Sequence, residues 1–307
     1  MDLLQAESVI DLIRAKTDLA LNTARAHLSG RLSKEISMIK EELVNLLCHI
    51  EAELDFPDED DVTRLSDGRV VEIIRRSETT IEKLLSTYEE GRIITEGLRV
   101  IIIGRANVGK SSLLNCLLKE ERAIVTPMPG TTRDVIEEVL NIRGIPVRLM
   151  DTAGLRETRD EVEEIGIRFT MDRLEKADMV LFVTDVSGGS ISDDLKLFER
   201  VYDDDKPSTK IARVAGTAGA GHSDMVLGKG FIIVFNKMDI KEDSQVSAYE
   251  KAFLNHKIVK ISALLEQGIE ELKDAIYGSV AKHGKEDIQE VIITNLRHKT
   301  ALEKAVH

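Results

Sequence analysis

The chain has 307 residues, of which 42% are hydrophobic, 32% are charged and only 4% are aromatic, a composition typical of globular domains with an aliphatic core. Its formal net charge of −13 disfavours a whole-surface attraction to nucleic acid or to an anionic membrane. Two cysteines are too few for a disulfide framework and no apolar stretch is long enough to span a bilayer, so we expect a cytoplasmic protein that does not bind membranes. Cys48 and Cys116 both lie in apolar helical patterns, and we expect both to be buried.

The first ninety or so residues predict helices. Apolar residues recur every three or four positions from Leu28 to Leu54, which indicates one face of a long amphipathic helix. The segment 56–60 contains a proline and ends that helix. A second helical run carries its apolar side over residues 70–88, and Gly91 and Gly97 then indicate a hinge into the next domain.

From Leu98 onward, short aliphatic runs alternate with helical patterns, which predicts a three-layer α/β domain with a mostly parallel sheet. The long stretch 186–230 predicts one helix at about residues 193–202, and the chain becomes helical again over 288–306. Residues 96–283 would then form an α/β domain inserted in an all-α helical domain made of residues 1–95 and 284–307. The expected strands are 100–103, 135–142, 147–150, 179–184, 231–235 and 258–261.

Residues 104–111 read G-x-x-x-x-G-K-S between a predicted strand and a predicted helix, the setting in which this motif binds the phosphates of a nucleotide. The N–H groups of the loop and the N-terminus of the helix present positive charge to phosphate oxygens. Lys110 should reach the β- and γ-phosphates, and the Ser111 hydroxyl should bind Mg²⁺. Taken alone, the motif is also compatible with a chance glycine-rich turn. The residues expected to bind the nucleotide here are Asn107, Val108, Gly109, Lys110, Ser111 and Ser112.

The sequence N-K-x-D at residues 236–239 directly follows a predicted strand and indicates guanine as the base. The Asp239 carboxylate can accept from guanine N1–H and N2–H₂ together, whereas adenine would leave it unpaired, and a mispaired buried polar group is strongly discriminated against. Asn236 should help to hold the edge of the base, and the stem of Lys237 should pack on its ring. Ser262 and Ala263 follow the last strand and should contact the base from the other side.

Two further segments predict a pair of loops that sense the γ-phosphate. Asp151 begins the sequence D-T-A-G at a strand end and should hold Mg²⁺ through water, while the N–H of Gly154 contacts the γ-phosphate. Thr132, in T-T-R-D, should close on Mg²⁺ when GTP is bound, and both loops should loosen after hydrolysis. Four motifs in this order, each at a strand end, predict a P-loop GTPase.

Position 155 holds Leu where many GTPases carry a Gln that orients the attacking water, so catalysis must be arranged in another way. At this point the chain resembles a known family. The segments that carry this resemblance are 96–100, 104–111, 130–134 and 151–157. On these segments, and over nearly its whole length, the chain is similar to the MnmE (TrmE) family of tRNA-modification GTPases.

The resemblance implies a GTPase that is activated by potassium and by dimerisation of its G domains. It implies that potassium is bound by the Asn107 side chain and by carbonyl oxygens of the loop 126–131. It also implies that Glu163 is the catalytic residue, which orients the attacking water through a second water. Pattern alone favours a solvated acid at a helix start for Glu163 and is equally compatible with a turn former at Asn107, and it is the resemblance that assigns Glu163 a catalytic role. The expected catalytic residues are Glu163, Thr132 and Gly154, the Mg²⁺ ligands are Ser111, Thr132 and Asp151, and the potassium ligands are Asn107, Thr126, Met128 and Thr131.

The resemblance also implies partners. Members of the family work as homodimers with an MnmG-like FAD protein and modify C5 of the wobble uridine of certain tRNAs with an aminomethyl or carboxymethylaminomethyl group. The one-carbon unit comes from a folate bound in an N-terminal domain, and a C-terminal C-x-G-K motif is characteristic. Neither that domain nor that motif is found in these 307 residues, so we expect them to be part of a longer protein.

Two other functions share part of this pattern. A ribosome-assembly GTPase of the Era or Der type has the same phosphate loop, T-T-R and N-K-x-D, but it predicts an RNA-binding module or a second G domain. A nucleotide-binding scaffold without significant turnover would use its helices to hold a partner and the nucleotide to set its shape. Hydrolysis of GTP in KCl and in NaCl separates these possibilities.

Overall fold

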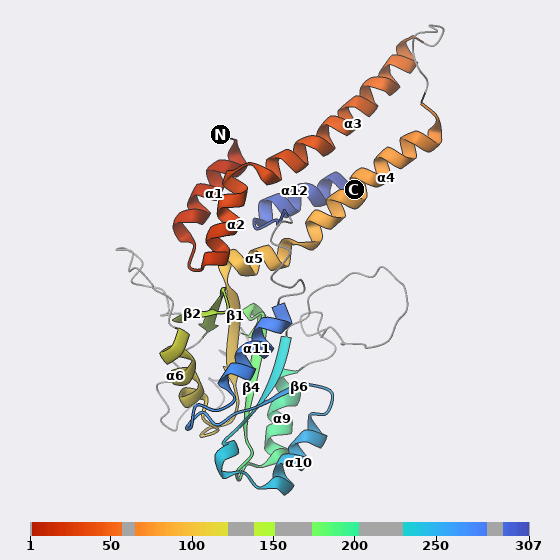
Figure 1. Ribbon diagram of the computed structural model, residues 1–307. Helices are drawn as coiled ribbons and strands as arrows, with labels where there is room; N and C mark the ends of the chain where they lie inside the picture. The colour runs from red at the N-terminus through yellow and green to blue at the C-terminus, as the bar shows by residue number, and fades with distance from the viewer. Residues whose placement is uncertain are drawn as a thin grey trace. The chain divides into compact units, whose positions relative to one another are not determined.

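The computed structural model describes residues 2–56, 65–121, 138–150, 174–202, 230–280 and 291–306, and the chain divides into two compact units (Figure 1). The first unit combines Met1–Glu96 with His283–His307, and the second unit is Gly97–Lys282. We call these the helical unit and the α/β unit. Within the described residues, no helix is long and apolar enough to cross a membrane.

The helical unit begins with helices whose ends are set by capping residues. Asp2 forms a capping box with Gln5, and Thr17 and Ser66 accept hydrogen bonds from the first turns of their helices. Gly30 has φ 81°, a left-handed conformation that separates the second helix from the third, so the predicted long helix starts at Arg31 and not at Leu28. The helices are α1 (Leu3–Arg14), α2 (Asp18–Leu28), α3 (Arg31–Asp55), α4 (Asp67–Ser86), α5 (Tyr88–Glu96) and α12 (Leu296–Val306).

The core of the helical unit joins segments from both ends of the chain. The returning segment 291–295 is not helical, so the predicted final helix begins at Leu296 instead of residue 288. Gly91 lies inside α5, where an added Cβ would stand 2.2 Å from the carbonyl oxygen of Ile293, so its predicted role in a hinge is wrong. Glycine is needed there because the backbone of the returning segment approaches α5 closely. The buried core cluster contains Leu32, Ile81, Leu84, Tyr88, Ile293 and Leu302.

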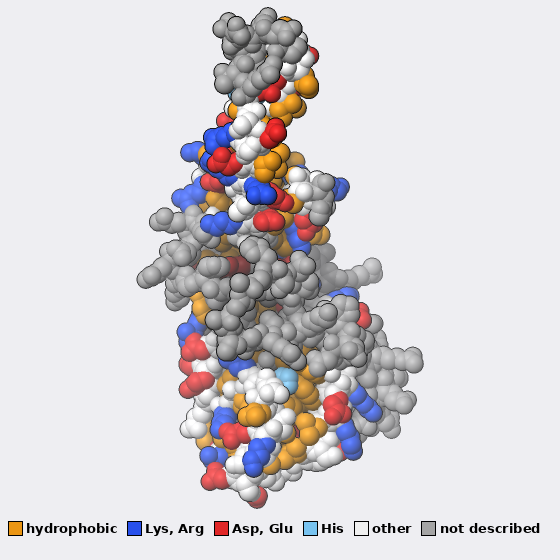
Figure 2. Space-filling model, turned by 90° about the vertical axis from the view of Figure 1, so that its right-hand side faces the viewer, with side chains coloured by type: hydrophobic (Ala, Val, Ile, Leu, Met, Phe, Trp, Pro, Cys, Tyr) orange, Lys and Arg blue, Asp and Glu red, His pale blue; other side chains and the backbone are white. Residues whose placement is uncertain are grey.

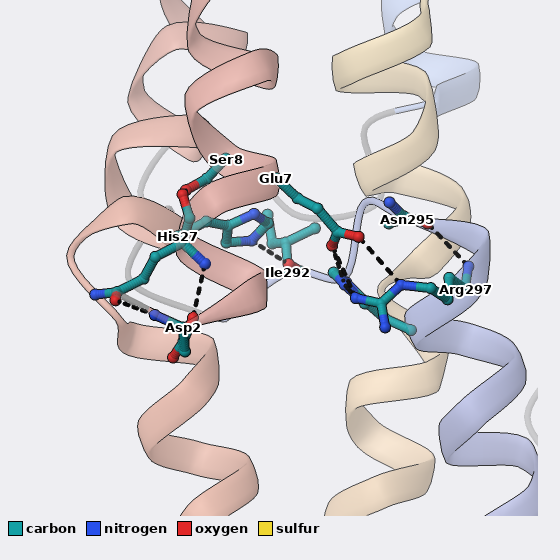
Figure 3. Close-up of polar contacts among 9 residues, drawn as sticks. Asp2, Glu7, Ser8, His27, Ile292, Asn295 and Arg297 are labelled. Atoms are coloured by element: carbon teal, nitrogen blue, oxygen red, sulfur yellow. Dashed lines mark hydrogen bonds and ion pairs between the residues drawn. The ribbon is translucent and has the colours of Figure 1, made fainter.

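Polar contacts reinforce this joining of the two ends (Figure 3). Arg297 donates two hydrogen bonds to the Glu7 carboxylate, at 3.1 and 2.9 Å, and His298 Nε2 lies 2.8 Å from the same carboxylate. The arginine is the main cause that holds the pKa of Glu7 below its usual value. The ring of His27 on α2 lies 2.6 Å from the carbonyl oxygen of Ile292, and burial lowers the pKa of this histidine.

The apolar stripe of α3 is longer than the part of it that other residues of the helical unit cover. Leu32 and Leu46 are buried, whereas Leu43 and Leu54, which the pattern placed on the same face, are 38% and 75% exposed. Figure 2 shows hydrophobic side chains at the surface among charged ones in the helical part of the chain. Cys48 is exposed as well, so the prediction that both cysteines are buried holds only for Cys116. Periodicity identifies a face of a helix but not the length over which a neighbour covers it.

Over its described residues, the α/β unit forms a six-stranded sheet of order β2-β3-β1-β4-β5-β6, in which the β2–β3 pair is antiparallel and the other described pairs are parallel. The central strands are buried on both faces, as a parallel sheet between two helical layers requires, and Leu181 and Phe182 are both fully buried although they point to opposite faces. The predicted fold class is therefore confirmed. The strands are β1 (Leu98–Ile103), β2 (Glu138–Ile142), β3 (Ile145–Met150), β4 (Met179–Asp185), β5 (Gly230–Asn236) and β6 (Lys257–Lys260).

Helices α9 and α10 pack their aromatic residues on one face of this sheet. Phe198 of α9 contacts Phe182 edge to face with ring centroids 5.3 Å apart, and it contacts Phe253, just after α10, in the same way at 5.2 Å. Among the described residues, the helices of this unit include α6 (Lys110–Glu121), α9 (Ile191–Val201), α10 (Asp243–Ala252) and α11 (Ile269–Val280), with a short 3₁₀ helix, η2 (Met238–Ile240). The predicted helix at residues 193–202 corresponds to α9.

Parallel pairing brings the carboxyl ends of β1, β4, β5 and β6 to one edge of the sheet. The register pairs Asp185, the last residue of β4, with Asn236, the last residue of β5. The segments that follow these strands include the G-x-x-x-x-G-K-S loop, N-K-x-D and the Ser262 turn. Sequence motifs more than 100 residues apart therefore meet at one place, where open α/β sheets bind ligands.

Candidate functional site

The phosphate loop, residues 104–109 between β1 and α6, has a backbone that few side chains allow. Asn107 and Gly109 have φ values of 62° and 98°. A Cβ on Gly104 would lie 2.3 Å from the carbonyl oxygen of Val183, so glycine is required there for close packing against β4. The loop ends at Lys110, where α6 begins, and it therefore presents main-chain N–H groups at a helix N-terminus.

Lys110 folds back over this loop. Its Nζ donates to the carbonyl oxygens of Gly104 at 2.8 Å and of Arg105 at 2.6 Å. Burial lowers the pKa of this lysine, because a charged ammonium loses hydration there. The loop thus holds a partly desolvated cation at the start of α6, an arrangement suited to an anionic ligand.

Asn236, at the end of β5, links the phosphate loop to a second loop. Its side chain is buried, its Nδ2 donates to the carbonyl oxygen of Val108 at 2.8 Å, and its Oδ1 accepts from the N–H of Ala263 at 2.9 Å. The second loop, residues 262–267, is closed by two main-chain hydrogen bonds between Ser262 and Gln267, and we call it the base loop. The prediction assigned Asn236 to the edge of the base, and the structure shows that both ends of its amide hold the two loops together.

The last residue of N-K-x-D, Asp239, contacts the base loop. Asp239 is exposed, and its Oδ1 accepts from the hydroxyl of the buried Ser262 at 2.5 Å. The hydroxyl oxygen of Ser262 in turn accepts from the N–H of Leu265 at 3.2 Å. Asp239 therefore presents a carboxylate whose orientation is set by the base loop, which is what pairing with two adjacent N–H donors of a planar base requires.

Two residues at this site were missed by the sequence analysis. Asp185 ends β4 and binds the Nζ of Lys237 at 2.5 Å. Cys116 on α6 is buried and donates its thiol to the carbonyl oxygen of Ala263 at 3.0 Å, so α6 contacts the base loop directly. An acid at a strand end was the available signal for Asp185, but the strand order that makes it a neighbour of Asn236 comes only from the structure. The sequence contains no signal for Cys116, because its apolar helical pattern indicates burial and not a hydrogen-bond partner.

The predicted residues of the two sensing loops, the potassium ligands of the loop 126–131 and the catalytic Glu163 all lie outside the described residues. The described parts of the chain hold no group of three or more His, Cys, Asp or Glu side chains arranged to bind a metal ion. The predicted site residues that lie outside the described residues are Thr126, Met128, Thr131, Thr132, Asp151, Gly154 and Glu163.

The sheet order, the phosphate loop after β1 and N-K-x-D after β5 together define an α/β domain of the P-loop GTPase class. The same chain also contains the helical unit. A family model described as the MnmE helical domain matches residues 3–307. The chain therefore belongs to the MnmE family, and the resemblance drawn from its motifs is confirmed.

The chain is also similar to curated relatives. It is 40% identical over 305 residues to the tRNA modification GTPase MnmE of Clostridioides difficile, and 41% identical over 305 residues to those of Bacillus licheniformis and Aquifex aeolicus. The matches cover 99% of this chain but only 61% of each relative, so the chain spans less than two thirds of their length.

Solved structures with a likeness to the chain include the G domain of the FeoB iron transporter of T. maritima. The identity is 24%, the TM-score is 0.39, and the match covers 59% of this chain and 98% of that domain. The G domain of FeoB from Methanococcus jannaschii matches with 26% identity and a TM-score of 0.37, over 60% of this chain and 98% of that domain.

Proposed function

We propose that this chain is the GTP-hydrolysing part of a tRNA modification GTPase. The proposal is supported by the family to which the chain belongs and by one observation at the site. Asn236 bonds to Val108 on one side and to Ala263 on the other, so the phosphate loop and the base loop form the two ends of a single site. A nucleotide whose phosphates occupy the first loop would bring its base against the second.

In this proposal the chain stabilises the charge of the phosphates while water attacks the γ-phosphate. Lys110 would exchange its two main-chain acceptors for phosphate oxygens. Because burial lowers the pKa of Lys110, the arrival of negative phosphate charge stabilises the protonated form. The N–H groups of residues 104–109 and the first turn of α6 act on the same charge without reorganising during the reaction.

Mg²⁺ fits the donors present at this site. Ser111 offers one hydroxyl oxygen at the first turn of α6, and phosphate oxygens and water would complete the octahedral set that this ion prefers. Such a site needs no cluster of side-chain ligands. We assign Ser111, Thr132 and, through a water molecule, Asp151 as the residues that hold the ion, which would neutralise phosphate charge when bound.

Potassium stimulation and dimerisation belong to the same proposal. Asn107 has an exposed side chain in the phosphate loop, so its amide oxygen is accessible to a cation. Carbonyl oxygens of Thr126, Met128 and Thr131 would complete the potassium site once two G domains meet. Glu163 would then orient the attacking water through a second water. The N–H of Gly154 and the hydroxyl of Thr132 would close on the nucleotide as switch contacts.

We infer the biological role from the similar proteins, which are named as tRNA modification GTPases. We propose that the chain acts as a homodimer with an MnmG-like FAD protein on the wobble uridine of tRNA in the cytoplasm, with folate bound by the N-terminal domain that the family carries. Membership of this family disfavours a ribosome-assembly GTPase. A nucleotide-binding scaffold without turnover is the alternative that an experiment must exclude.

The test uses the 307-residue chain in two assays. Titration calorimetry with GDP, GTP and ATP should show guanine nucleotides bound at least about a hundredfold more tightly than ATP. Lys110→Met should weaken GDP binding by more than about tenfold, whereas the exposed Lys304→Met of the helical unit should leave it unchanged. Equal affinity for ATP and GTP would refute guanine recognition.

Turnover then separates the remaining possibilities. GTP hydrolysis at equal ionic strength should be faster in KCl than in NaCl, and equal rates would contradict the potassium site. Tight GTP binding without measurable hydrolysis in either salt would favour the scaffold.

A further inference from the structure

Asp185 is an acid at the carboxyl edge of the sheet that no motif of the sequence assigned. It ends β4 directly beside the end of β5, and the register pairs it with Asn236. Its Oδ2 accepts a hydrogen bond from Lys237 Nζ at 2.5 Å. The ion pair therefore joins neighbouring strands at the place where the base is expected to bind.

The carboxylate of Asp185 is itself held in one orientation. Its other oxygen, Oδ1, accepts from the N–H of Ser187 at 2.9 Å and from the Ser187 hydroxyl at 2.6 Å. Burial alone would raise the pKa of Asp185, but the hydrogen bonds from Lys237 and Ser187 outweigh it, so the pKa is below its usual value. The side chain is only 17% exposed and stays charged at neutral pH.

Lys237 has an unusual backbone as well as a bound end. It adopts φ 61° and ψ 37°, a left-handed conformation, immediately before the 3₁₀ helix that carries Asp239. A free lysine side chain samples many rotamers. The backbone and the ammonium of Lys237 are therefore both held, and the four methylene groups between them connect the start of the N-K-x-D turn to Asp185.

We propose that Asp185 is a positioning residue for guanine recognition. It holds the ammonium of Lys237, and the extended lysine stem forms an apolar surface against which the base stacks while Asp239 binds its edge. This inference rests on the proposed guanine-nucleotide site. It assigns to Asp185 an action through Lys237 and not a contact with the phosphates.

The test compares ligands with and without a base, on the full chain, by titration calorimetry. Asp185→Asn should weaken GDP binding by about threefold to thirtyfold, a loss that lies within the range of coupling between contacting residues. Binding of inorganic tripolyphosphate, which has no base, should stay unchanged. Asp243→Asn is the matched control, because Asp243 also pairs with a lysine, Lys241, at 3.4 Å but is 92% exposed. It should bind GDP like the wild-type chain.

A double-mutant cycle tests whether Asp185 acts through Lys237. In a Lys237→Met background, Asp185→Asn should have no further effect on GDP affinity, because the ammonium that it holds is gone. Additive effects would overturn the inference, and so would equal losses for GDP and tripolyphosphate, which a merely structural role predicts. If Asp185→Asn does not fold, Ser187→Ala, which removes one donor to the carboxylate, should show the same base-dependent loss in smaller measure.

The two proposals fail in different ways. A wild-type chain that binds no guanine nucleotide would overturn both the proposed function and this inference. A wild-type chain that binds GDP tightly, with an Asp185→Asn variant of equal affinity, would overturn the inference alone.

Discussion

Gly109 is the residue whose replacement tests the geometry of the site most sharply without any ligand. It has φ 98°, and a Cβ at this position would lie 2.1 Å from Nδ2 of Asn236. That nitrogen already donates to the carbonyl oxygen of Val108. Gly109→Ala must therefore strain the backbone and also push Asn236 away from its acceptor.

The magnitude follows from these two effects. A left-handed conformation costs a residue with a Cβ about 1–2 kcal/mol, and leaving a buried polar partner unsatisfied costs about 1–3 kcal/mol. Gly109→Ala should therefore lower the free energy of unfolding by about 2–5 kcal/mol. In an Asn236→Ala background the overlap is gone, and the same substitution should cost only the backbone strain of about 1–2 kcal/mol. The two substitutions should thus be coupled by about 1–3 kcal/mol.

Urea unfolding of the nucleotide-free chain, followed by circular dichroism, measures all four members of this cycle. Gly188→Ala is the matched control, because nothing lies within 4 Å of a Cβ added there, and it should change the unfolding free energy by less than about 0.5 kcal/mol. Strictly additive effects of Gly109→Ala and Asn236→Ala would refute the reasoning, and so would a loss at Gly109 no larger than that at Gly188.

Two predictions concern the helical unit. Gly91→Ala should lower its unfolding free energy by about 1–3 kcal/mol, because the added Cβ would overlap the carbonyl of Ile293 at 2.2 Å, whereas Gly68→Ala in the first turn of α4, with open space around it, should be neutral or stabilising in the same urea titration. Glu7 has a lowered pKa, so the stability that it contributes is fully present above its usual value of 4.5 and is lost as the pH falls through the lowered pKa. Glu7→Gln should accordingly flatten the fall in thermal stability between about pH 5 and pH 3, and melting curves that shift in parallel with the wild-type chain would contradict the role given to Arg297.

The sequence predicted the sheet well because parallel strands are buried on both faces and therefore appear as continuous aliphatic runs. Apart from the start of β2, which was predicted at residue 135 and lies at Glu138, each strand in the described residues lies within about two residues of its predicted position. The phosphate loop and N-K-x-D follow the ends of β1 and β5 as expected. The aliphatic runs do not show the order of the strands in the sheet, yet this order makes Asp185 and Asn236 neighbours. A contact between two strand ends cannot be read from either strand alone.

The helical unit was predicted less well, for a related physical reason. Gly91 looked like a hinge because glycine weakens helices, but it is required by the carbonyl of Ile293, 202 positions further along the chain. Cys48 and Leu54 share an apolar pattern with the buried Leu46, yet both are exposed. Hydrophobic periodicity reports the face of a helix, and only the tertiary structure shows which neighbour covers it.

At the candidate site, the sequence predicted which residues gather but not how each is held. The interpretation of Asn236 as a contact to the base did not include its bonds to Val108 and Ala263. These bonds depend on the close approach of two loops more than 100 residues apart. The sensing loops, with Thr132, Asp151 and Glu163, stay predictions because they lie outside the described residues.

The central claim is that the carboxylate of Asp239 selects guanine, and one substitution tests it directly. Asp239→Asn replaces one acceptor oxygen with a donor, which suits the N1–H and C2 carbonyl of xanthine in place of the N1–H and amino group of guanine. Titration calorimetry on the full chain should show GDP binding reduced by more than about a hundredfold and xanthosine diphosphate binding strengthened, so that the preference reverses. An Asp239→Asn variant that still prefers GDP to xanthosine diphosphate would contradict the account.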